Sequence, residues 1–417
     1  MNTSDRHGGA ARSAYRLHLG LKHAGLDSGM FVQDKEGTDS DVYGAGGKSA
    51  KLVAKLRPYV DRIPAGVLYR EREHNFTPAI VPGRAIGRIN ALQPDIVHLH
   101  WLGKGFIRLG ALKRLKPGPV VWTLHDSWAF TGGCHIPYSC TRYRERCGRC
   151  PVLDSGRDYD LSRWVWNRKS RVLGDLDLTV VTPSRWLGDC ARRSGLFRDT
   201  RVEVIPNGID VGMYKPLDQG FCRKALSLPA GKKIVMFGAM YSTSDRNKGF
   251  DYLVSALRKI AATPLRDEVV AVVIGADAPD DGVDVGLDIR FLGQLNDDTS
   301  LAVAYSAADL FVAPSKQENL PNMVMEAMAC GVPCVAFDIG GMPDMIEHRK
   351  TGYLARPYEP EDLAEGMRWI IADREVKRGL SMTAREKIVA NFSENLVAER
   401  YRSLYNEILK DRKACQS

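Results

Sequence analysis

The chain repeats short runs rich in β-branched residues, each of which leads into a turn and then a helix-like stretch. The first half contains such runs at 95–100, 120–125 and 178–182. The second half contains them at 233–238, 269–275, 289–293, 309–314 and 332–338. Strands that alternate with helices indicate βαβ units, and therefore parallel sheets covered by helices. The sequence thus predicts an α/β protein.

Two domains are expected, because 417 residues exceed the roughly 250–300 at which one hydrophobic core stops growing. Between the two series of strands, Pro206 and the pair Asn207-Gly208 break a strand and mark a turn. We therefore place a Rossmann-like N-terminal domain at 1–207 and a Rossmann-like C-terminal domain at 208–390. A final helix at 391–417 is expected to pack back on the N-terminal domain.

The start of the chain is read as a loop at 1–9 followed by a helix at about 10–24. No strand precedes them, so we expect the first strand to be missing, either because the start codon lies upstream or because the sheet lacks this element. After Tyr353 the spacing of apolar residues predicts helices to about residue 412. Residues that carry this spacing are Leu363, Met367, Ile370 and Ile371.

The formal net charge is +9 and the sequence pI is about 9.0, which suits an anionic partner. Charge alone leaves nucleic acid, an acidic membrane surface and a phosphorylated substrate open. The sequence contains no run of about 18 apolar residues and no signal-peptide pattern. We therefore expect a cytoplasmic protein, peripheral at the inner face of the cell membrane.

The most informative segment surrounds Glu318 and Glu326 and follows a strand that is expected to be buried. Pro321 fits the first turn of a helix, where its missing N–H costs nothing. Glu318 then lies before the helix and Glu326 inside it, at the edge of a parallel sheet where α/β proteins bind ligands. The backbone N–H groups from Asn319 and Leu320 onward suit a diphosphate. Carboxylates on both sides suit sugar hydroxyls.

Glu318 and Glu326 form an E-x7-E motif. In this motif the sequence resembles the retaining glycosyltransferases of GT-B fold, family GT4. The resemblance covers the whole chain and is densest over 202–356. Further sequence motifs of the family follow in the same order, at 205–210, Lys248-Gly249, Gly293, Pro314-Ser315, 331–333 and 340–343.

The resemblance implies two Rossmann-like domains that face across a cleft, and a role for each acid. By analogy, Glu326 holds the ribose of the donor, Glu318 holds the hexose, and Lys248 neutralises the diphosphate. The family carries an arginine after the strand where this sequence has Ala239, so Arg246 is the candidate replacement. The family needs no divalent metal and retains the configuration of the donor.

In the N-terminal domain, His125 at the end of a strand resembles the active-site histidine of the family, with the neighbouring Asp126 as an alternative. Gly8 and Gly9 resemble the first glycine loop of the family, which lets backbone approach the donor or acceptor. Side chains that end the preceding strand are candidates for the acceptor cleft, with one of the two histidines expected in the core. They are His98, His100 and Trp101.

Four cysteines lie within seventeen residues, and the last two form C-x-x-C: Cys134, Cys140, Cys147 and Cys150. Four thiolates can hold a structural zinc ion that pins a loop without regular structure. Reduced thiols and disulfides are the alternatives. Similar cysteine-rich loops after a histidine-ended strand occur in bacterial GT4 enzymes of exopolysaccharide synthesis, such as colanic acid assembly, which this chain resembles.

We therefore expect a hexosyltransferase that needs no cofactor for catalysis. It would move a hexose from a nucleotide-sugar donor to a saccharide or lipid-linked saccharide, in exopolysaccharide or other cell-surface polysaccharide synthesis. An epimerase or hydrolase of the same fold and a non-catalytic nucleotide-sugar-binding protein remain alternatives. A zinc-dependent nucleic-acid-binding protein would show a basic stripe with interleaved aromatics. Because Lys and Arg are scattered over both domains, no nucleic-acid partner is expected.

Overall fold

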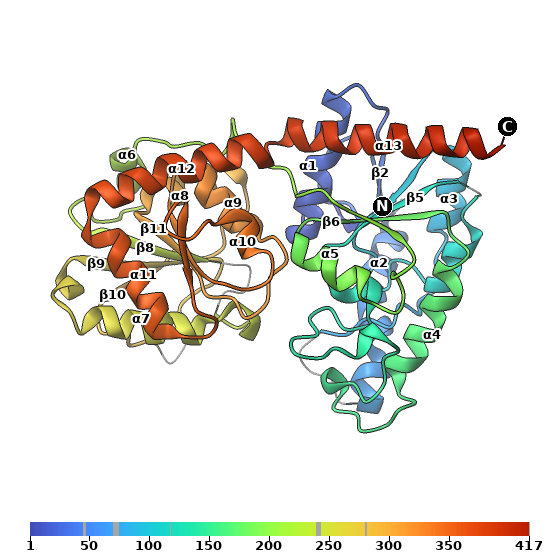
Figure 1. The fold of residues 1–417 in the computed structure, drawn as a ribbon, viewed down its shortest axis with the longest axis horizontal. Coiled ribbons are helices and arrows are strands. Elements are labelled where there is room, and N and C mark those ends of the chain that lie inside the picture. Colours follow the sequence, from blue (N-terminus) through green and yellow to red (C-terminus); the bar gives the residue numbers. More distant parts are fainter. Residues whose placement is uncertain (45–46, 70–74, 117, 239–242, 280–281, 417) are drawn as a thin grey trace. The chain divides into compact units, whose positions relative to one another are not determined.

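The computed structural model describes residues 1–44, 47–69, 75–116, 118–238, 243–279 and 282–416. The chain divides into two compact units (Figure 1). The first contains Met1–Pro206 together with Val397–Ser417, and the second contains Asn207–Leu396. Each unit is a parallel sheet covered by helices, as the strand and helix pattern predicts.

The strands of the first unit form two runs, ordered β1-β2-β3 and β4-β5-β6-β7. Two backbone hydrogen bonds of 2.9 Å join the runs, from Thr3 N–H to the Trp101 carbonyl and from His100 N–H to the Met1 carbonyl. The order across the unit is therefore β3-β2-β1-β4-β5-β6-β7. The strands are β1 (Asn2–Ser4), β2 (Met30–Asp34), β3 (Val42–Tyr43), β4 (Val97–Leu99), β5 (Val120–Thr123), β6 (Leu178–Thr182) and β7 (Arg201–Val204).

Strand β1 corrects the expectation that the first strand is missing. Asn2 pairs with Val32 and Ser4 with Asp34, in parallel register with β2. The predicted loop therefore begins only after Ser4, and helix α1 (Gly9–His23) follows close to its expected bounds. The three residues of β1 are buried. Because all three are polar, they lack the apolar alternation by which a strand is recognised in a sequence.

Helices cover both faces of the first sheet. α3, α4 and α5 pack on the face that carries Trp122 and Val180, whereas α1 and the part of α13 from Val397 onward pack against Val121 and Val181. The remaining helices of this unit are α2 (Gly47–Tyr69), α3 (Ala85–Leu92), α4 (Leu161–Leu173), α5 (Arg185–Arg192) and α13 (Glu394–Gln416). Short 3-10 turns are η1 (Leu109–Arg114), η2 (Ser127–Phe130), η3 (Arg142–Arg144) and η4 (Pro151–Leu153).

The second unit contains one parallel sheet in the order β10-β9-β8-β11-β12-β13. This is the order of a doubly wound Rossmann sheet, with the reversal between β8 and β11. Its strands are β8 (Lys233–Gly238), β9 (Val269–Ile274), β10 (Asp288–Phe291), β11 (Leu310–Ala313), β12 (Cys334–Phe337) and β13 (Gly352–Ala355). The runs predicted at 178–182 and 233–238 match β6 and β8, whereas the short β2, β3 and β13 were not recognised from the sequence.

Helices α7 and α11 cover one face of the second sheet, and α6, α8, α9 and α12 cover the other (Figure 1). They are α6 (Gln219–Ala225), α7 (Phe250–Ala261), α8 (Asp298–Ala307), α9 (Asn322–Ala329), α10 (Met342–Met345), α11 (Pro360–Ala372) and α12 (Arg374–Phe392), with 3-10 turns η5 (Arg246–Lys248) and η6 (Pro264–Asp267). Several begin at an aspartate whose side chain accepts a backbone N–H of the first turn, as Asp297 does for α8. Among the described helices, none combines the length and the hydropathy that a membrane crossing needs.

Candidate functional site

Three loops that follow neighbouring strands of the second unit meet at one edge of its sheet. β8 leads to η5, β11 leads to Glu318, and β12 leads to Gly340 and Gly341. The carboxyl ends of parallel strands lie at the same edge. Because the strand order reverses between β8 and β11, these loops lie at the switch point where open α/β sheets form their ligand crevices.

Asn247 ties two of these loops together. Its side-chain amide donates to the Gln317 carbonyl at 2.9 Å, and its side-chain oxygen accepts from the Gln317 N–H at 3.1 Å. Its own carbonyl accepts from the Lys316 N–H at 2.8 Å, and the residue is 4% exposed. Sequence reasoning missed Asn247, because a lone asparagine beside Lys248 has no pattern that distinguishes a buried bridge from a surface side chain.

Lys248 and Glu318, both predicted to act in catalysis, form an ion pair with 2.6 Å between Nζ and Oε1. Their side chains are 24% and 14% exposed. Burial by itself lowers the pKa of Lys248, but the adjacent Glu318 carboxylate outweighs it, so this pKa lies above its ordinary value. The pair therefore places a permanent cation beside a carboxylate, and both groups keep some exposure to a ligand.

Two glycines allow these loops to approach each other. Gly249 has a φ of +70°, and a Cβ there would lie 1.9 Å from the Pro314 carbonyl oxygen. Gly340 has a φ of +54°, and its Cβ would lie 1.9 Å from the Glu318 carbonyl oxygen. The same carbonyl accepts from the Gly341 N–H at 3.1 Å. Only glycine fits such backbone conformations and contacts.

Glu326 lies inside α9, as predicted, and Pro321 caps that helix instead of standing in its first turn. The Glu326 side chain is 0% exposed, and its Oε2 accepts a hydrogen bond from the Tyr305 hydroxyl at 3.0 Å. A buried carboxylate needs such a donor. Tyr305, on α8, was not recognised from the sequence, where it reads as an ordinary core aromatic. The contact of Glu326 with a ribose stays a prediction.

The other residues that are predicted to bind the donor differ in which of their groups a ligand can reach. The Leu320 side chain is 5% exposed and packs in the core, so only its backbone can contact a ligand. Asn319 is half-buried at the entry to α9. Arg246 is exposed on the same turn as Lys248. Ala239, which replaces the arginine of the family, lies outside the described residues.

In the first unit, His125 lies just past the end of β5. Its Nε2 is 3.0 Å from His100 Nδ1, and the two rings stack with centroids 5.3 Å apart. Burial lowers the pKa of His125 to about 4, although the carboxylate of Asp126 opposes this shift. His125 is therefore neutral near pH 7, and its ring can both donate and accept a hydrogen bond.

His98 links the end of β4 to the C-terminal helix. Its Nδ1 lies 2.6 Å from the Tyr405 hydroxyl, and its Nε2 lies 2.7 Å from Thr123 Oγ1. The Thr123 hydroxyl is in turn 2.8 Å from that of Tyr401. As the alternation along the strand allows, one of the two histidines is buried: His100 is 8% exposed, whereas His98 is half-buried. Both rings bond to protein groups.

Asp126, the alternative to His125, anchors the local backbone. Its Oδ2 accepts from Trp101 Nε1 and from His135 Nδ1, both at 2.7 Å, and its Oδ1 accepts from the Trp128 N–H at 2.8 Å. The aspartate thereby caps η2. With three protein donors already bound, this carboxylate is better suited to hold Trp101 and His135 in place than to exchange protons.

Gly8 and Gly9 follow β1, next to β4 in the first sheet. Gly8 has a φ of +93°, and no protein atom lies within 4 Å of a Cβ built there. The residue is therefore glycine because of its backbone conformation and not because protein crowds it. Gly9 begins α1. The approach of a ligand to this loop stays a prediction.

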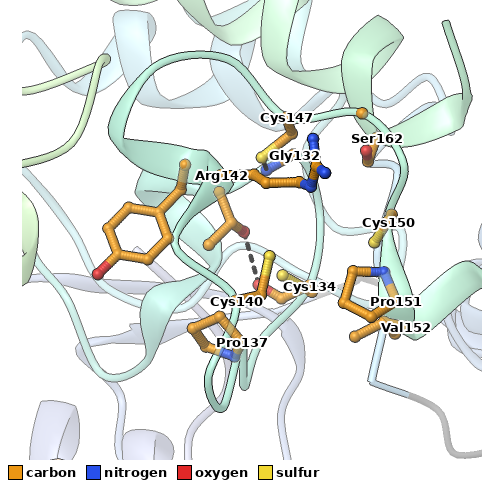
Figure 2. Close-up of a pocket in the computed structure, with 13 residues that line it drawn as sticks. Gly132, Cys134, Pro137, Cys140, Arg142, Cys147, Cys150, Pro151, Val152 and Ser162 are labelled. Carbon is orange, nitrogen blue, oxygen red and sulfur yellow. Dashed lines mark hydrogen bonds between the residues drawn. The ribbon is translucent and has the colours of Figure 1, made fainter. Parts of the chain in front are cut away.

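The four clustered cysteines line one pocket, together with Thr131, Arg142 and Ser162 (Figure 2). Each is a free thiol. Burial raises the pKa of Cys147 to about 12 and that of Cys150 to about 11. Within the described residues, no three His, Cys, Asp or Glu side chains are arranged so that they could hold a metal ion. The predicted zinc site therefore stays a prediction, which we take up below.

Comparisons with known proteins identify both units. The family model described as Glycosyltransferase Family 4 matches residues 7–212, and the model described as Glycosyl transferases group 1 matches residues 231–373. Together they account for most of the chain. The chain belongs to glycosyltransferase family 4.

This family 4 chain is similar to the sulfoquinovosyl transferase SQD2 of Arabidopsis thaliana, with 26% identity over 87% of this chain and 63% of that one. It is also similar to the alpha-maltose-1-phosphate synthase of Mycolicibacterium smegmatis, with 27% identity over 61% of this chain and 68% of that one. The chain spans about three fifths of the length of the curated relatives that it matches first.

Among solved structures, the family 4 chain resembles the sucrose-phosphate synthase of Thermosynechococcus elongatus. The TM-score is 0.69 at 23% identity, over 98% of this chain and 96% of that one. Identity at this level shows the fold. Together with the two Rossmann-like units, it confirms the predicted GT-B fold class.

Proposed function

We propose that this protein is a retaining glycosyltransferase that moves a hexose from a nucleotide-sugar donor. The observation that carries the proposal is the Lys248–Glu318 pair, with 2.6 Å between Nζ and Oε1, at the switch point of the second sheet. A cation that stays charged suits the diphosphate of a donor, and an adjacent carboxylate suits the hydroxyl groups of a sugar. Neither group alone would recognise both halves of such a molecule.

The start of α9 supplies the second anion-binding element. Its first backbone N–H groups lack partners within the helix and carry the positive end of the helix dipole. The loop that contains Glu318 leads directly into it. In our proposal the diphosphate lies between these N–H groups, those of Asn319 and Leu320 in the preceding loop, and the Lys248 ammonium, with Arg246 as a further cation. No divalent metal is then required for charge neutralisation.

The transfer needs little proton chemistry from the protein. The bond between the anomeric carbon and the phosphate oxygen breaks, and a bond forms between that carbon and the acceptor oxygen on the same face. The proton of the acceptor hydroxyl passes to the departing phosphate. Configuration is thereby retained. His125, which burial keeps neutral, is proposed to hydrogen-bond to the donor sugar or the diphosphate, and not to act as the base.

For the acceptor, we propose a saccharide or lipid-linked saccharide of a bacterial exopolysaccharide or other cell-surface polysaccharide. The resemblance of the cysteine-rich loop to enzymes of exopolysaccharide synthesis motivates this choice. The names of the curated relatives cover several acceptor classes, among them D-inositol 3-phosphate and L-malate. They support a sugar transfer without selecting the acceptor.

A second observation favours a lipid-linked acceptor. Helix α2 exposes one apolar face, while Ala54, Asp61 and Ala65 are buried. Lys51 and Lys55 are exposed on the same helix. The apolar side chains are between 47% and 73% exposed, and they are Leu52, Val53, Leu56, Tyr59, Val60, Ile63, Val67 and Leu68.

An exposed apolar face of this size marks an interaction surface. Asp61, the acidic residue of this helix, accepts backbone N–H groups of Ala79 and Ile80, so its charge is turned inward. The exposed charges of α2 are therefore basic, as on helices that lie in the interface of anionic membranes. We propose that α2 attaches the first unit to an anionic membrane surface.

Sedimentation with vesicles of phosphatidylcholine, with or without phosphatidylglycerol, tests this attachment. We expect binding to the anionic vesicles that weakens with added salt and that is lost in the double variant Leu56→Ser, Ile63→Ser. The matched control is Phe221→Ser, because Phe221 is 65% exposed on the second unit. Unchanged binding of the double variant would overturn the assignment, as would a wild-type dimer that the double variant converts to monomer.

The transferase proposal is tested by a thermal-shift screen against UDP, GDP, ADP and their sugar conjugates, since a ligand that binds the native state stabilises it. We expect one nucleotide family to stand out and its sugar conjugate to be turned over once an acceptor is added. Retention is read from the anomeric signals of the product by NMR. Donor hydrolysis or epimerisation at an equal rate without acceptor would replace the transferase proposal by one of those activities.

A further inference from the structure

The loop between η2 and α4 contains a small pocket that the proposed transfer does not use. Figure 2 shows Cys147 and Cys150 on two sides of it, and Cys134 and Cys140 together on a third. Cys134, Cys147 and Cys150 are buried, and Cys140 is half-buried. The cavity has a volume of about 10 Å³, close to the room of a single water molecule. It suits a single ion.

The backbone around the pocket directs an N–H group at one of the sulfur atoms. The Gly132 N–H donates to Cys147 Sγ at 3.0 Å. A neutral thiol is a weak acceptor, so this hydrogen bond strengthens when the sulfur is a thiolate. Donors to ligating atoms are a regular part of metal sites, because they orient the ligands.

Lys169, on α4, gives an independent reason to expect negative charge here. Its side chain is 0% exposed, and its ammonium lies 3.8 Å from the centre of the Trp128 ring. In the described part of the chain, the amine bonds to the carbonyl groups of Trp128 and Thr131 and to no carboxylate. A buried cation is costly unless an opposite charge balances it.

Burial lowers the pKa of Lys169 to about 7, and the nearby Cys147, Cys134 and Asp126 oppose this shift. As neutral thiols the two cysteines offer the amine no charge. Four thiolates around a divalent zinc ion carry two net negative charges, which would favour a charged lysine here. A metal-loaded cluster thus adds negative charge beside this buried amine.

We propose that Cys134, Cys140, Cys147 and Cys150 bind one zinc ion that fixes the loop between η2 and α4. The sulfur atoms do not yet surround a common point, so binding requires them to rotate about their single χ1 bonds into the pocket. Each thiol loses its proton as its sulfur coordinates. Four protein ligands leave no open position, so the ion is structural and takes no part in sugar transfer.

The first experiment uses the full chain without a histidine tag, expressed with zinc in the medium and purified under reducing conditions. Metal analysis should find about one zinc per chain. Replacement of zinc by cobalt should give the visible spectrum of tetrahedral cobalt with four thiolates. A folded, metal-free protein with four accessible or titratable thiols in this loop would overturn the proposal, as would disulfides between these cysteines in a peptide map.

A pair of variants separates the site from general effects of cysteine loss. Cys140→Ser is chosen because Cys140 is the least buried of the four, and it should lose most of the zinc. Cys190→Ser is the control, since Cys190 is a half-buried thiol of the same unit outside the pocket. A chelator should lower the melting temperature of the wild type and of Cys190→Ser, and leave that of Cys140→Ser nearly unchanged. Full zinc occupancy in Cys140→Ser would contradict the proposed ligand set.

This proposal stands apart from the proposed transferase activity. The pocket belongs to the first unit, whereas Lys248 and Glu318 belong to the second. Zinc removal should therefore leave the direct binding of the nucleotide in place, as measured by calorimetry on the chelator-treated protein. Zinc analysis and nucleotide binding can succeed or fail independently, so each result bears on one proposal alone.

Discussion

The ammonium of Lys248 lies 2.6 Å from Glu318 Oε1, although seventy positions separate the two residues in the chain. The contact exists because β8 and β11 are neighbours in the sheet and Asn247 binds the backbone of the Glu318 loop. The two groups that we assign to the diphosphate and the hexose are thus held as one unit before any ligand arrives. Such preorganisation is what electrostatic catalysis requires.

Glu318→Gln is expected to lower kcat by about two to three orders of magnitude with little change in melting temperature. The amide keeps the size of the side chain but removes the charge that holds the sugar and pairs with Lys248. The measurement is steady-state turnover with the donor found in the nucleotide screen. Glu361→Gln is the control, because Glu361 is an exposed acid of the same unit, paired with Lys259. Turnover near the wild-type rate in Glu318→Gln would remove this residue from the mechanism.

Lys248→Met is expected to weaken donor binding more than Lys248→Arg does, because the arginine keeps the cation that faces the diphosphate. Calorimetric titration with the nucleoside diphosphate measures the difference, which we expect to be about tenfold or more, as for a charged hydrogen bond. Lys259→Met controls for loss of a surface cation. Equal affinities of the Met and Arg variants would contradict the proposed contact.

Asn247→Ala is expected to lower the free energy of unfolding by about 1–3 kcal/mol, because it leaves the buried Gln317 N–H and carbonyl without their partner. It should also lower kcat, since Lys248 and Glu318 lose their fixed spacing. Chemical denaturation and turnover are measured side by side. In Asn391→Ala, which removes one exposed hydrogen bond of α12, both quantities should stay near wild type. Full activity in Asn247→Ala would show that the bridge does not position the pair.

Variants of Glu326 and Tyr305 can distinguish a contact of Glu326 with the donor ribose from a purely structural role of this side chain. Tyr305→Phe removes only the hydroxyl that bonds to the buried Glu326, so it should cost about 1–3 kcal/mol of stability and leave nucleotide affinity nearly unchanged. Glu326→Ala should weaken donor binding far more than it lowers the melting temperature. Normal donor affinity in folded Glu326→Ala would exclude the ribose assignment and leave this carboxylate a structural role.

Because its pKa differs between the folded and unfolded protein, His125 makes the free energy of unfolding depend on pH. Its pKa in the folded protein is about 4, below the value of about 6.5 for an unfolded histidine. The unfolded chain therefore binds more protons between these values, and the free energy of unfolding should fall by up to about 3 kcal/mol as the pH is lowered from 6.5 to 4. Urea denaturation across this range measures it.

His125→Gln should make the decline shallower. The effect will not vanish, since burial also lowers the pKa values of His98 and His100. An identical slope in His125→Gln and wild type would show that this imidazole is not kept neutral by the fold.

The order of the elements could be read from the sequence wherever a strand was long and apolar. β8 contains the apolar run 234–237, and β9 is apolar throughout. Buried parallel strands require such runs. β1 escaped recognition because Asn2, Thr3 and Ser4 are polar, and their burial depends on β2 and on the chain at His100 and Trp101. No local pattern reports contacts made across a hundred residues.

The sequence by itself determined the α/β class with its two Rossmann-like units, and it predicted Glu318 and Glu326 as site residues, because periodicity and motif spacing are local properties of the chain. Only the tertiary structure decided that Asn247 joins two loops, that Tyr305 binds Glu326, and that His98 bonds to Tyr405. Each of these contacts joins residues from different strands or helices. Their geometry depends on how those elements pack, which no spacing along the chain encodes.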